Sequence, residues 1–341
     1  MMGVVRPALA RKHRMNSPRR VDLALLAVAI VWGSSYLATK DVVEPHTVFG
    51  FLVIRFGLAA TVLALITAPR LRRLNRAEVF LGMVFGAVLS VVFTLETYGV
   101  TGTSAANAGF IISLTIVMTP LLDMCVRRAR LPGAFYLAAA VAVVGVGVLT
   151  GAAPLIASTH GDGLIVLAAC VRAVHVTAIA RLSGGRTLDS ARLTLVQLCT
   201  GLAVFAALSA LTGQHVGDVA VRMGGRGWLV TAYLAVVCAV FAFVVQTWAV
   251  RRTSPTRVSL LLGTEPLWAA TGAVLVAGDP ITGSGAAGAV LILLGTTWGG
   301  VLDARRMRPG DERGSRQSQW LRRKFRYRKP QTVAINVSTA G

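Results

Sequence analysis

The sequence has few charged residues, and it is especially short of acidic ones. Charged side chains make up 14% of its 341 residues, and only 14 residues are Asp or Glu. A soluble domain carries roughly 25% charged residues, so the composition excludes an ordinary soluble protein. The 35 Lys and Arg residues outnumber the acidic ones and leave a formal net charge of +21, so the arrangement of the basic residues becomes informative.

Residues that bind metals, form disulfides or drive catalysis are scarce as well. The five His show no metal-ligand spacing, and the four Cys lie in apolar segments without paired spacing. They predict neither a metal site nor a disulfide framework. No Walker phosphate loop occurs, so ATP is not the expected energy source. A membrane-embedded enzyme would need His, Asp or Glu clustered at a membrane face, and none is visible, so we expect no enzymatic activity and no cofactor.

Long apolar segments dominate the rest of the chain. Hydrophobic residues make up 55% of the sequence, and a membrane helix needs about 20 mostly apolar residues. The segments lack the alternation of strands, so they predict helices rather than barrel strands. We therefore predict an all-α integral membrane protein with ten transmembrane helices, at residues 21–39, 46–68, 77–99, 103–125, 132–151, 162–182, 189–212, 227–249, 256–278 and 284–302.

The placement of the basic residues predicts the orientation of these helices. Of the 35 Lys and Arg residues, 29 fall in the N-terminal segment, the tail and the loops that this topology places on one side, and three fall in the opposite loops. By the positive-inside rule, both termini of this multi-pass protein are cytoplasmic. Because the basic residues are spread over short loops rather than gathered in one folded module, nucleic acid is not an expected partner.

The ten predicted helices divide into two halves of five. Thr103-Ser104-Ala105 precedes the fourth helix of one half, and Thr253-Ser254-Pro255 precedes its counterpart. An odd number of helices per half makes the second half enter from the opposite side, so the halves would form inverted repeats around a midplane site. We predict a basic cytoplasmic N-terminus at 1–20, five-helix repeats at 21–151 and 162–302, and a basic cytoplasmic tail at 303–341.

Pairs of glycines four residues apart lie at the end of the fifth helix of each half. Gly147 and Gly151 form one pair, and Gly295 and Gly299 form the other. Small residues let helix backbones approach closely, which suits packing within the chain or a homodimer. A chain with 35 Gly also produces such pairs by chance, so these alternatives stay open.

Five segments resemble the motifs of a known membrane family, in the expected order. They are VWGSSYLATK at 31–40, FLVIRFGLAA at 51–60, YGVTGTSAANAG at 98–109, QTWAVRRTSP at 246–255 and LLGTEP at 261–266. The set resembles the EamA family of the drug/metabolite transporter superfamily over roughly residues 21–302. The resemblance implies ten helices in two inverted repeats and movement of small metabolites or drugs across the inner (plasma) membrane, often outward.

The chain also departs from that family pattern. The sixth helix of the family often carries a Trp where this chain has CVRAVH at 170–175, so no relative's substrate is transferred to it. The tail at 303–341 has no counterpart in the family. Its segment 313–329 mixes basic and aromatic residues, which fits binding to anionic lipid headgroups, with an unstructured solvated tail as the alternative.

Four ionisable residues fall near the middle of predicted spans, where a charge costs at least about 2.5–3.5 kcal/mol. They are Arg55, Arg172, His175 and Glu265. We predict that they line a central substrate cavity, in which the Arg side chains suit an anionic group. Glu265 would bind an amine or carry a proton, and His175 would change charge near neutral pH. The alternative is a buried Arg–Glu pair that fixes helix packing and touches no substrate.

Four further residues complete the predicted site. Trp32 and Ser35 belong to the first-helix motif and are predicted to line the substrate path. Glu96 lies nearer the outer end of its span, and Asn107 follows across the next turn. We therefore predict Glu96 and Asn107 at the outer rim of the cavity.

Two prolines lie within the fourth helix of each half, Pro120 in one and Pro266 in the other. Proline removes a backbone donor and bends a helix, and broken helices at matching places often border a transport site. We predict helix breaks at both prolines, with a tolerated kink as the alternative.

Together these features predict a secondary transporter that exports a small metabolite, an amino-acid-like compound or a drug by alternating access. Its expected partners are a small-molecule substrate and the lipid bilayer. A proton-coupled importer of a small metabolite and a non-transporting membrane scaffold or sensor are the alternatives.

Overall fold

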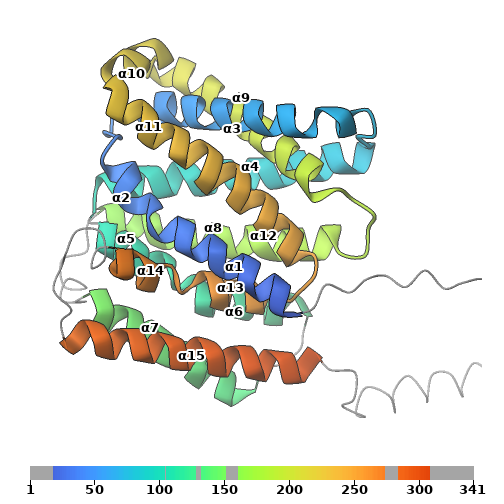
Figure 1. The fold of residues 1–341 in the computed structure, drawn as a ribbon, viewed down its shortest axis with the longest axis vertical. Coiled ribbons are helices and arrows are strands. Elements are labelled where there is room, and N and C mark those ends of the chain that lie inside the picture. The colour runs from blue at the N-terminus through green and yellow to red at the C-terminus, as the bar shows by residue number, and fades with distance from the viewer. Residues whose placement is uncertain (1–17, 104, 128–131, 151–159, 273–282, 308–341) are drawn as a thin grey trace, which may run out of the picture.

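The computed structural model describes residues 18–103, 105–127, 132–150, 160–272 and 283–307. Every regular element within them is a helix, which confirms the predicted all-α class (Figure 1). The helices are α1 (Pro18–Gly33), α2 (Ser35–Lys40), α3 (Val48–Leu71), α4 (Arg76–Thr101), α5 (Ala105–Ile112), α6 (Thr115–Arg127), α7 (Gly133–Thr150), α8 (His160–Ser183), α9 (Ser190–Thr212), α10 (Val216–Arg222), α11 (Gly224–Ala235), the π-helical turn η2 (Val236–Phe241), α12 (Ala242–Val250), α13 (Pro255–Leu262), α14 (Glu265–Gly272) and α15 (Gly283–Met307).

Eight helical spans in the described residues are long and apolar enough to cross a membrane. They correspond to eight of the ten predicted spans, and some combine two or three labelled elements, as α11, η2 and α12 do. The predicted span at 132–151 is a shorter apolar helix, α7. The predicted span at 256–278 includes α13 and α14, which have 8 residues each, and its residues 273–278 lie outside the described part of the chain. Within the described residues, length and apolarity therefore identify eight of the ten predicted spans.

Three spans are broken where a side-chain hydroxyl bonds the carbonyl three residues earlier. Ser34 Oγ does so between α1 and α2 at 2.8 Å, and Ser113 Oγ does so between α5 and α6 at 2.5 Å. Thr264 Oγ1 makes the same bond between α13 and α14 at 2.7 Å. Such bonds give the backbone a partner outside the regular helix pattern. The breaks in α5–α6 and α13–α14 lie at matching places in the two halves.

The two predicted proline breaks have different outcomes. Pro266 is the second residue of α14 and directly follows the break at Thr264. Pro120 lies inside α6, and the break in that span comes earlier, at Ser113 and Leu114. The prediction of a break at Pro120 was therefore wrong, because the helix is interrupted where the Ser113 hydroxyl bonds the backbone.

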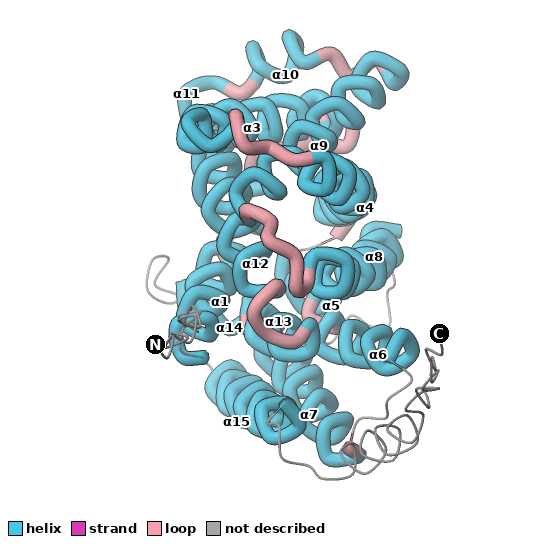
Figure 2. Tube along the Cα trace, turned by 90° about the vertical axis from the view of Figure 1, so that its right-hand side faces the viewer, coloured by secondary structure: helices cyan, strands magenta, loops and turns pink. Residues whose placement is uncertain are grey.

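The two halves of the chain interlock. Helix α4 packs on α8 and α9, α3 on α9, α6 on α8 and α13, α1 on α12 and α14, and α7 on α15. In each pair one helix comes from the first half of the chain and the other from the second. Figure 1 shows layers that run from α3, α9 and α11 at one end to α7 and α15 at the other, and Figure 2 shows α8 and α12 between them. A site in the middle layers therefore draws its residues from both halves.

Glycines make the close contact between α7 and α15. A Cβ added to Gly295 would lie 2.5 Å from the backbone nitrogen of Ala142, and one added to Gly288 would overlap the backbone of Leu149. Neither position has room for a methyl group, so the two backbones meet through glycine. Of the predicted glycine pairs, Gly295 packs within the chain, whereas Gly151 lies outside the described residues.

Candidate functional site

A narrow polar cavity lies between the halves, surrounded by α1, α2, α3 and α4 on one side and by α8, α12 and α14 on the other. Its volume is about 30 Å³, and one water needs about 10–15 Å³ on that measure. A metabolite could therefore enter only if the surrounding helices moved apart. All six residues predicted to bind substrate line this cavity, namely Trp32, Ser35, Arg55, Arg172, His175 and Glu265.

Arg172 of α8 and Glu265 of α14 form an ion pair in the cavity wall. Arg172 Nη2 donates to Glu265 Oε1 at 2.9 Å, and the two side chains are 12% and 4% exposed. The guanidinium carbon also lies 4.3 Å from the centre of the Trp32 ring, a favourable cation–π distance. The sequence analysis left two alternatives for these residues, a cavity lining and a buried Arg–Glu pair. The structure shows both features together, because the ion pair is buried and lines the cavity.

Only one oxygen of the Glu265 carboxylate accepts a hydrogen bond from the described residues. Its Oε2 atom is buried and has no hydrogen-bond partner among the described residues. Glu265 begins α14, and the Pro266 that follows has no N–H to donate. A buried acceptor without a donor costs about 1–3 kcal/mol, so a hydrogen-bond donor on a ligand would be favoured at this oxygen.

Within the described part of the chain, Arg55 is a buried cation that forms no ion pair. The residue is 4% exposed, and its buried Nε has no hydrogen-bond partner. Its guanidinium carbon lies 4.9 Å from the centre of the Phe93 ring, which in turn contacts Phe56 and Phe243. A mid-membrane charge costs at least about 2.5–3.5 kcal/mol. An anionic group bound in the cavity would offset this cost through charge-assisted hydrogen bonds.

Hydrogen bonds within the protein hold three of the lining side chains. Trp32 Nε1 donates to the Cys238 carbonyl in η2 at 2.8 Å, and such π-helical turns recur at functional sites. Ser35 Oγ donates to the Trp32 carbonyl at 2.8 Å. His175 Nε2 lies 3.1 Å from Gln197 Oε1 and donates to it, because an amide oxygen only accepts. These side chains are therefore fixed in place without a ligand.

The predicted outer rim is only partly described. Glu96 of α4 lines the same cavity as Arg55, is half-buried and forms no ion pair within the described residues. Asn107 belongs to α5, and its side chain lies outside what the structure describes. The structure thus brings Glu96 to the central cavity, and the role of Asn107 stays a prediction.

Sequence reasoning missed the neutral part of the cavity lining. Tyr36, Phe93, Phe243 and Gln246 all face this space, but neutral and aromatic side chains inside an apolar span give little signal. Gln246 could have been identified, because an amide is costly to bury without a partner. Its buried Oε1 indeed has no hydrogen-bond partner in the described residues.

The cavity presents opposite charges to a ligand. Arg55 offers a cation, Glu265 Oε2 offers a free acceptor, and Glu96 adds a second carboxylate beside aromatic walls. Together they could hold a small molecule that carries both an anionic and a cationic group. No group of three or more His, Cys, Asp or Glu within the described residues could hold a metal ion.

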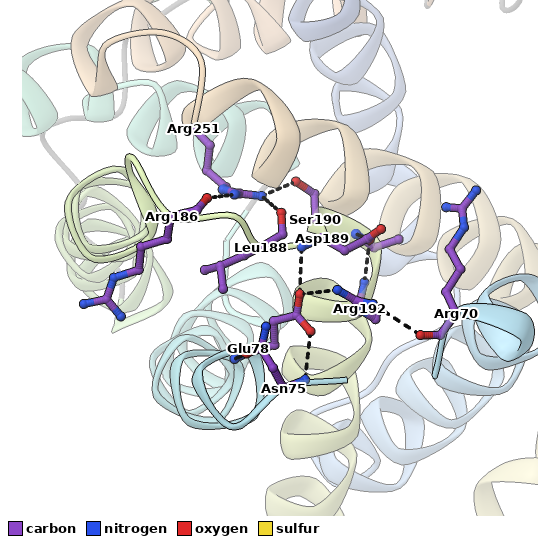
Figure 3. A network of polar contacts seen from close by, with 10 residues as sticks. Arg70, Asn75, Glu78, Arg186, Leu188, Asp189, Ser190, Arg192 and Arg251 are labelled. Atoms are coloured by element: carbon purple, nitrogen blue, oxygen red, sulfur yellow. Dashed lines mark hydrogen bonds and ion pairs between the residues drawn. The ribbon is translucent and has the colours of Figure 1, made fainter. Parts of the chain in front are cut away.

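A second buried carboxylate, Glu78, lies where the α3–α4 and α8–α9 connections meet (Figure 3). Glu78 Oε1 accepts from the Asp189 amide at 2.8 Å and from Arg192 Nη2 at 2.7 Å, and Oε2 accepts from the Asn75 amide at 3.2 Å. Arg251, which directly follows α12, donates to the backbone oxygens of Arg186 and Leu188 in the α8–α9 connection and to the Ser190 hydroxyl at the start of α9. Both oxygens of Glu78 are thus used, and this cluster ties the ends of several helices together.

Comparison with known protein families identifies the repeat unit. The family model described as the EamA-like transporter family matches residues 19–151 and matches again at residues 159–298. Two consecutive matches mean that the chain contains two copies of one unit. The cavity is built from both copies, since Arg55 belongs to the first and Arg172 and Glu265 belong to the second.

Individual proteins resemble the chain to different extents. An "Uncharacterized transporter" of Archaeoglobus fulgidus is 31% identical over 107 residues. That match covers 31% of this chain and 32% of the relative, so the chain spans about a third of the length of this curated relative. A solved structure described as "Crystal structure of protein" has a TM-score of 0.68 at 17% identity and covers 85% of this chain and 99% of that one. At this identity the likeness shows the fold alone.

Proposed function

Because this chain belongs to the EamA-like transporter family, we propose that it exports a small zwitterionic, amino-acid-like metabolite by alternating access. Its family and its apolar helical spans make it a multi-pass membrane transporter of the drug/metabolite transporter superfamily. The proposal adds a class of substrate, a direction and a mechanism to that description. Transport of a small molecule, rather than enzymatic conversion, is the activity proposed.

The observation that carries the proposal is the unsatisfied charge of the cavity. Arg55 has no ion-pair partner and Glu265 Oε2 has no donor among the described residues, although both residues are buried. A carboxylate at Arg55 and an ammonium group at Glu265 or Glu96 would satisfy both. Charge-assisted hydrogen bonds of this kind are about twice as strong as neutral ones. A zwitterion is therefore favoured over a molecule with one charge or none.

The narrow cavity supports an alternating-access mechanism. With a volume of about 30 Å³, it leaves no room for a metabolite unless the halves separate. Helices broken at matching places, as in α5–α6 and α13–α14, often border the site in transporters whose repeats rock around it. We propose ten membrane-crossing helices in two inverted repeats, at 21–151 and 162–302, with both termini on the cytoplasmic side of the inner membrane.

Two further expectations about partners belong to the same proposal. The basic tail at 303–341 would bind anionic lipid headgroups on the cytoplasmic side. A homodimer would have to use other outer faces of the helices, since the glycine contact of Gly295 is made within the chain. Neither contact is required for the cavity to work.

Exchange of labelled amino acids by purified protein in liposomes tests the proposed function. We expect saturable exchange of a zwitterion such as leucine, and much slower exchange of N-acetylleucine and leucinamide, which each lack one charge. Arg55→Met should slow the exchange of the zwitterion. Its matched control is Arg252→Met, because Arg252, like Arg55, stacks on an aromatic ring (Trp248, at 4.7 Å) but lies outside the cavity. Zwitterion exchange no faster than in protein-free liposomes would contradict the proposal.

Export is tested separately in cells. Overproduction of the protein should lower the internal content of the transported amino acid and raise its external content. Accumulation inside the cells would instead favour the importer alternative, in which Glu265 or Glu96 would be candidates for carrying the coupled proton.

A further inference from the structure

A second hollow adjoins the central cavity on the side of α5 and α14. Its volume is about 260 Å³, much larger than that of the central cavity. An engineered apolar cavity of about 150 Å³ binds benzene, so this hollow has room for a large aliphatic side chain. Its wall is apolar and built mainly of small residues, among them Gly33, Ala105, Gly109, Ala269 and Ala270. We call it the side pocket.

Gly109 of α5 lines the side pocket. It is buried, yet a Cβ added to it would meet no other atom within 4 Å in the described residues. A Cβ added to Gly33, by contrast, would lie 2.7 Å from the Glu265 carbonyl oxygen. Glycine is also a poor helix former, and neither a close contact nor a left-handed backbone requires it at position 109. A side chain introduced at position 109 would therefore meet no described neighbour on the side of the pocket.

The side pocket and the central cavity share two wall residues, Tyr36 and Glu265. Arg172 holds Oε1 of Glu265, and Oε2 is buried without a partner among the described residues. A donor that bonds Oε2 would therefore stand at the junction of the two spaces. The charged part of such a ligand could lie in the central cavity while its apolar part enters the side pocket.

We propose that the side pocket binds the apolar side chain of the transported zwitterion and so selects substrates by side-chain size. This inference rests on the proposed function and takes the case in which the amine meets Glu265 and the carboxylate meets Arg55. Glu265 is the only charged residue among those that line the side pocket in the described structure, so an aliphatic side chain fits it and a charged one does not. One methylene more or less in a hydrophobic pocket changes specificity by about 10–200-fold.

Filling the side pocket tests this inference. Gly109→Leu places a side chain in the open space, and Gly109→Ala fills it in part. The matched control is Gly163→Leu in α8, because Gly163 is exposed and a Cβ there also meets nothing within 4 Å. Exchange of leucine and of alanine is measured in liposomes for each variant, and thermal melting checks that each variant is folded.

In Gly109→Leu, kcat/KM for leucine should fall about tenfold or more, while the value for alanine stays close to that of the wild type. Gly109→Ala should give a smaller loss for leucine, and Gly163→Leu should change neither substrate. Equal losses for both substrates, or no loss for leucine, would overturn the side-pocket inference alone. Loss of a co-purified lipid from Gly109→Leu, with leucine exchange unchanged, would identify a lipid chain as the occupant instead. Failure of the wild type to exchange either amino acid would overturn the proposed function and this inference with it.

Discussion

Two buried Arg–Glu pairs lie in different parts of this protein, one in the central cavity and one at the helix ends, and their hydrogen bonds differ. At the helix ends, Glu78 is fully buried and accepts three N–H donors with its two oxygens. In the cavity, Glu265 is also buried and pairs with Arg172, but only one of its oxygens has a partner in the described residues. The two pairs have similar lengths, 2.7 and 2.9 Å.

The difference separates a charge that holds the fold from a charge that can bind a ligand. A buried polar group with all its hydrogen bonds made contributes rigidity and has nothing left to offer. A buried carboxylate with an oxygen that accepts no hydrogen bond destabilises the protein, and a ligand that donates to this oxygen would offset that free energy. Arg55 extends the contrast, because it is buried in the same cavity without an ion-pair partner among the described residues. The Glu78 cluster should therefore matter for stability, and the cavity residues should matter for transport.

Replacing each glutamate by glutamine should give the largest difference between the two pairs. In Glu78→Gln the new N–H₂ group must point at one or more of the three N–H donors that Glu78 accepts from, so at least one hydrogen bond is replaced by two opposed donors. The negative charge paired with Arg192 is lost as well. We expect a loss of about 3–5 kcal/mol in the free energy of unfolding, seen as a lower melting temperature in detergent. In Glu265→Gln the charge paired with Arg172 is lost as well, but the amide can take the place of Oε2, which loses no hydrogen bond among the described residues, so the loss of stability should be smaller. Equal losses in the two variants would remove the contrast.

Arg55→Met should lower transport strongly without lowering stability. Two hydrogen bonds to a charged group contribute about 1.5–3 kcal/mol each, so kcat/KM for a zwitterion should fall about 100-fold or more. Removing a buried cation that forms no ion pair among the described residues should leave the melting temperature unchanged or raise it. The control Arg252→Met should leave transport near the wild-type value. A destabilised but active Arg55→Met protein would show that Arg55 acts in packing.

The Arg172 and Glu265 pair is tested by combining two changes. We expect Arg172→Ala and Glu265→Gln each to abolish transport while folded protein remains in the membrane. The double variant should recover stability relative to Arg172→Ala, with a coupling of about 0.5–3 kcal/mol, but it should not recover transport. Melting temperature and liposome exchange are measured on all three proteins. A fully active double variant would reduce the pair to helix packing.

Deletion of residues 304–341, which removes the tail and the last four residues of α15, should have the smallest effect, because these residues are remote in sequence from both Glu78 and Glu265. If it only binds headgroups or solvent, the truncated protein should exchange substrate at a rate within about twofold of the full chain, since polybasic segments act through the membrane surface. Membrane abundance is measured alongside exchange. Loss of transport at unchanged abundance would give the tail a part in the mechanism.

Much of the fold follows from the sequence, because membrane helices need long apolar segments and the motifs occur in order. The mid-span charges Arg55, Arg172 and Glu265 were found for the same physical reason, since a charge is costly there. The pairing of Glu78 with Arg192, 114 residues later, was not found, because residues near helix ends look like ordinary loop charges. The sequence predicted the helix break at Pro120 instead of at Ser113, because proline is a stronger sequence indication of a helix break than serine in an apolar helix.

The side pocket could not be predicted either. Gly109 is one of 35 glycines, and only the packed structure separates a glycine that meets a neighbouring backbone from one that borders open space. The same limit applies to Gly295, whose contact with α7 depends on how the two halves interlock.

The central claim is that the cavity holds a zwitterion by its two charges, and ligand-induced thermal stabilisation tests this claim most directly. The measurement compares leucine, N-acetylleucine and leucinamide on the wild type, Arg55→Met and Arg252→Met. The account predicts that leucine raises the melting temperature of the wild type and of Arg252→Met more than either analogue does. It also predicts that Arg55→Met no longer distinguishes leucine from leucinamide, because the group that reads the carboxylate is gone. Equal stabilisation of the wild type by all three compounds, or an unchanged preference in Arg55→Met, would contradict it.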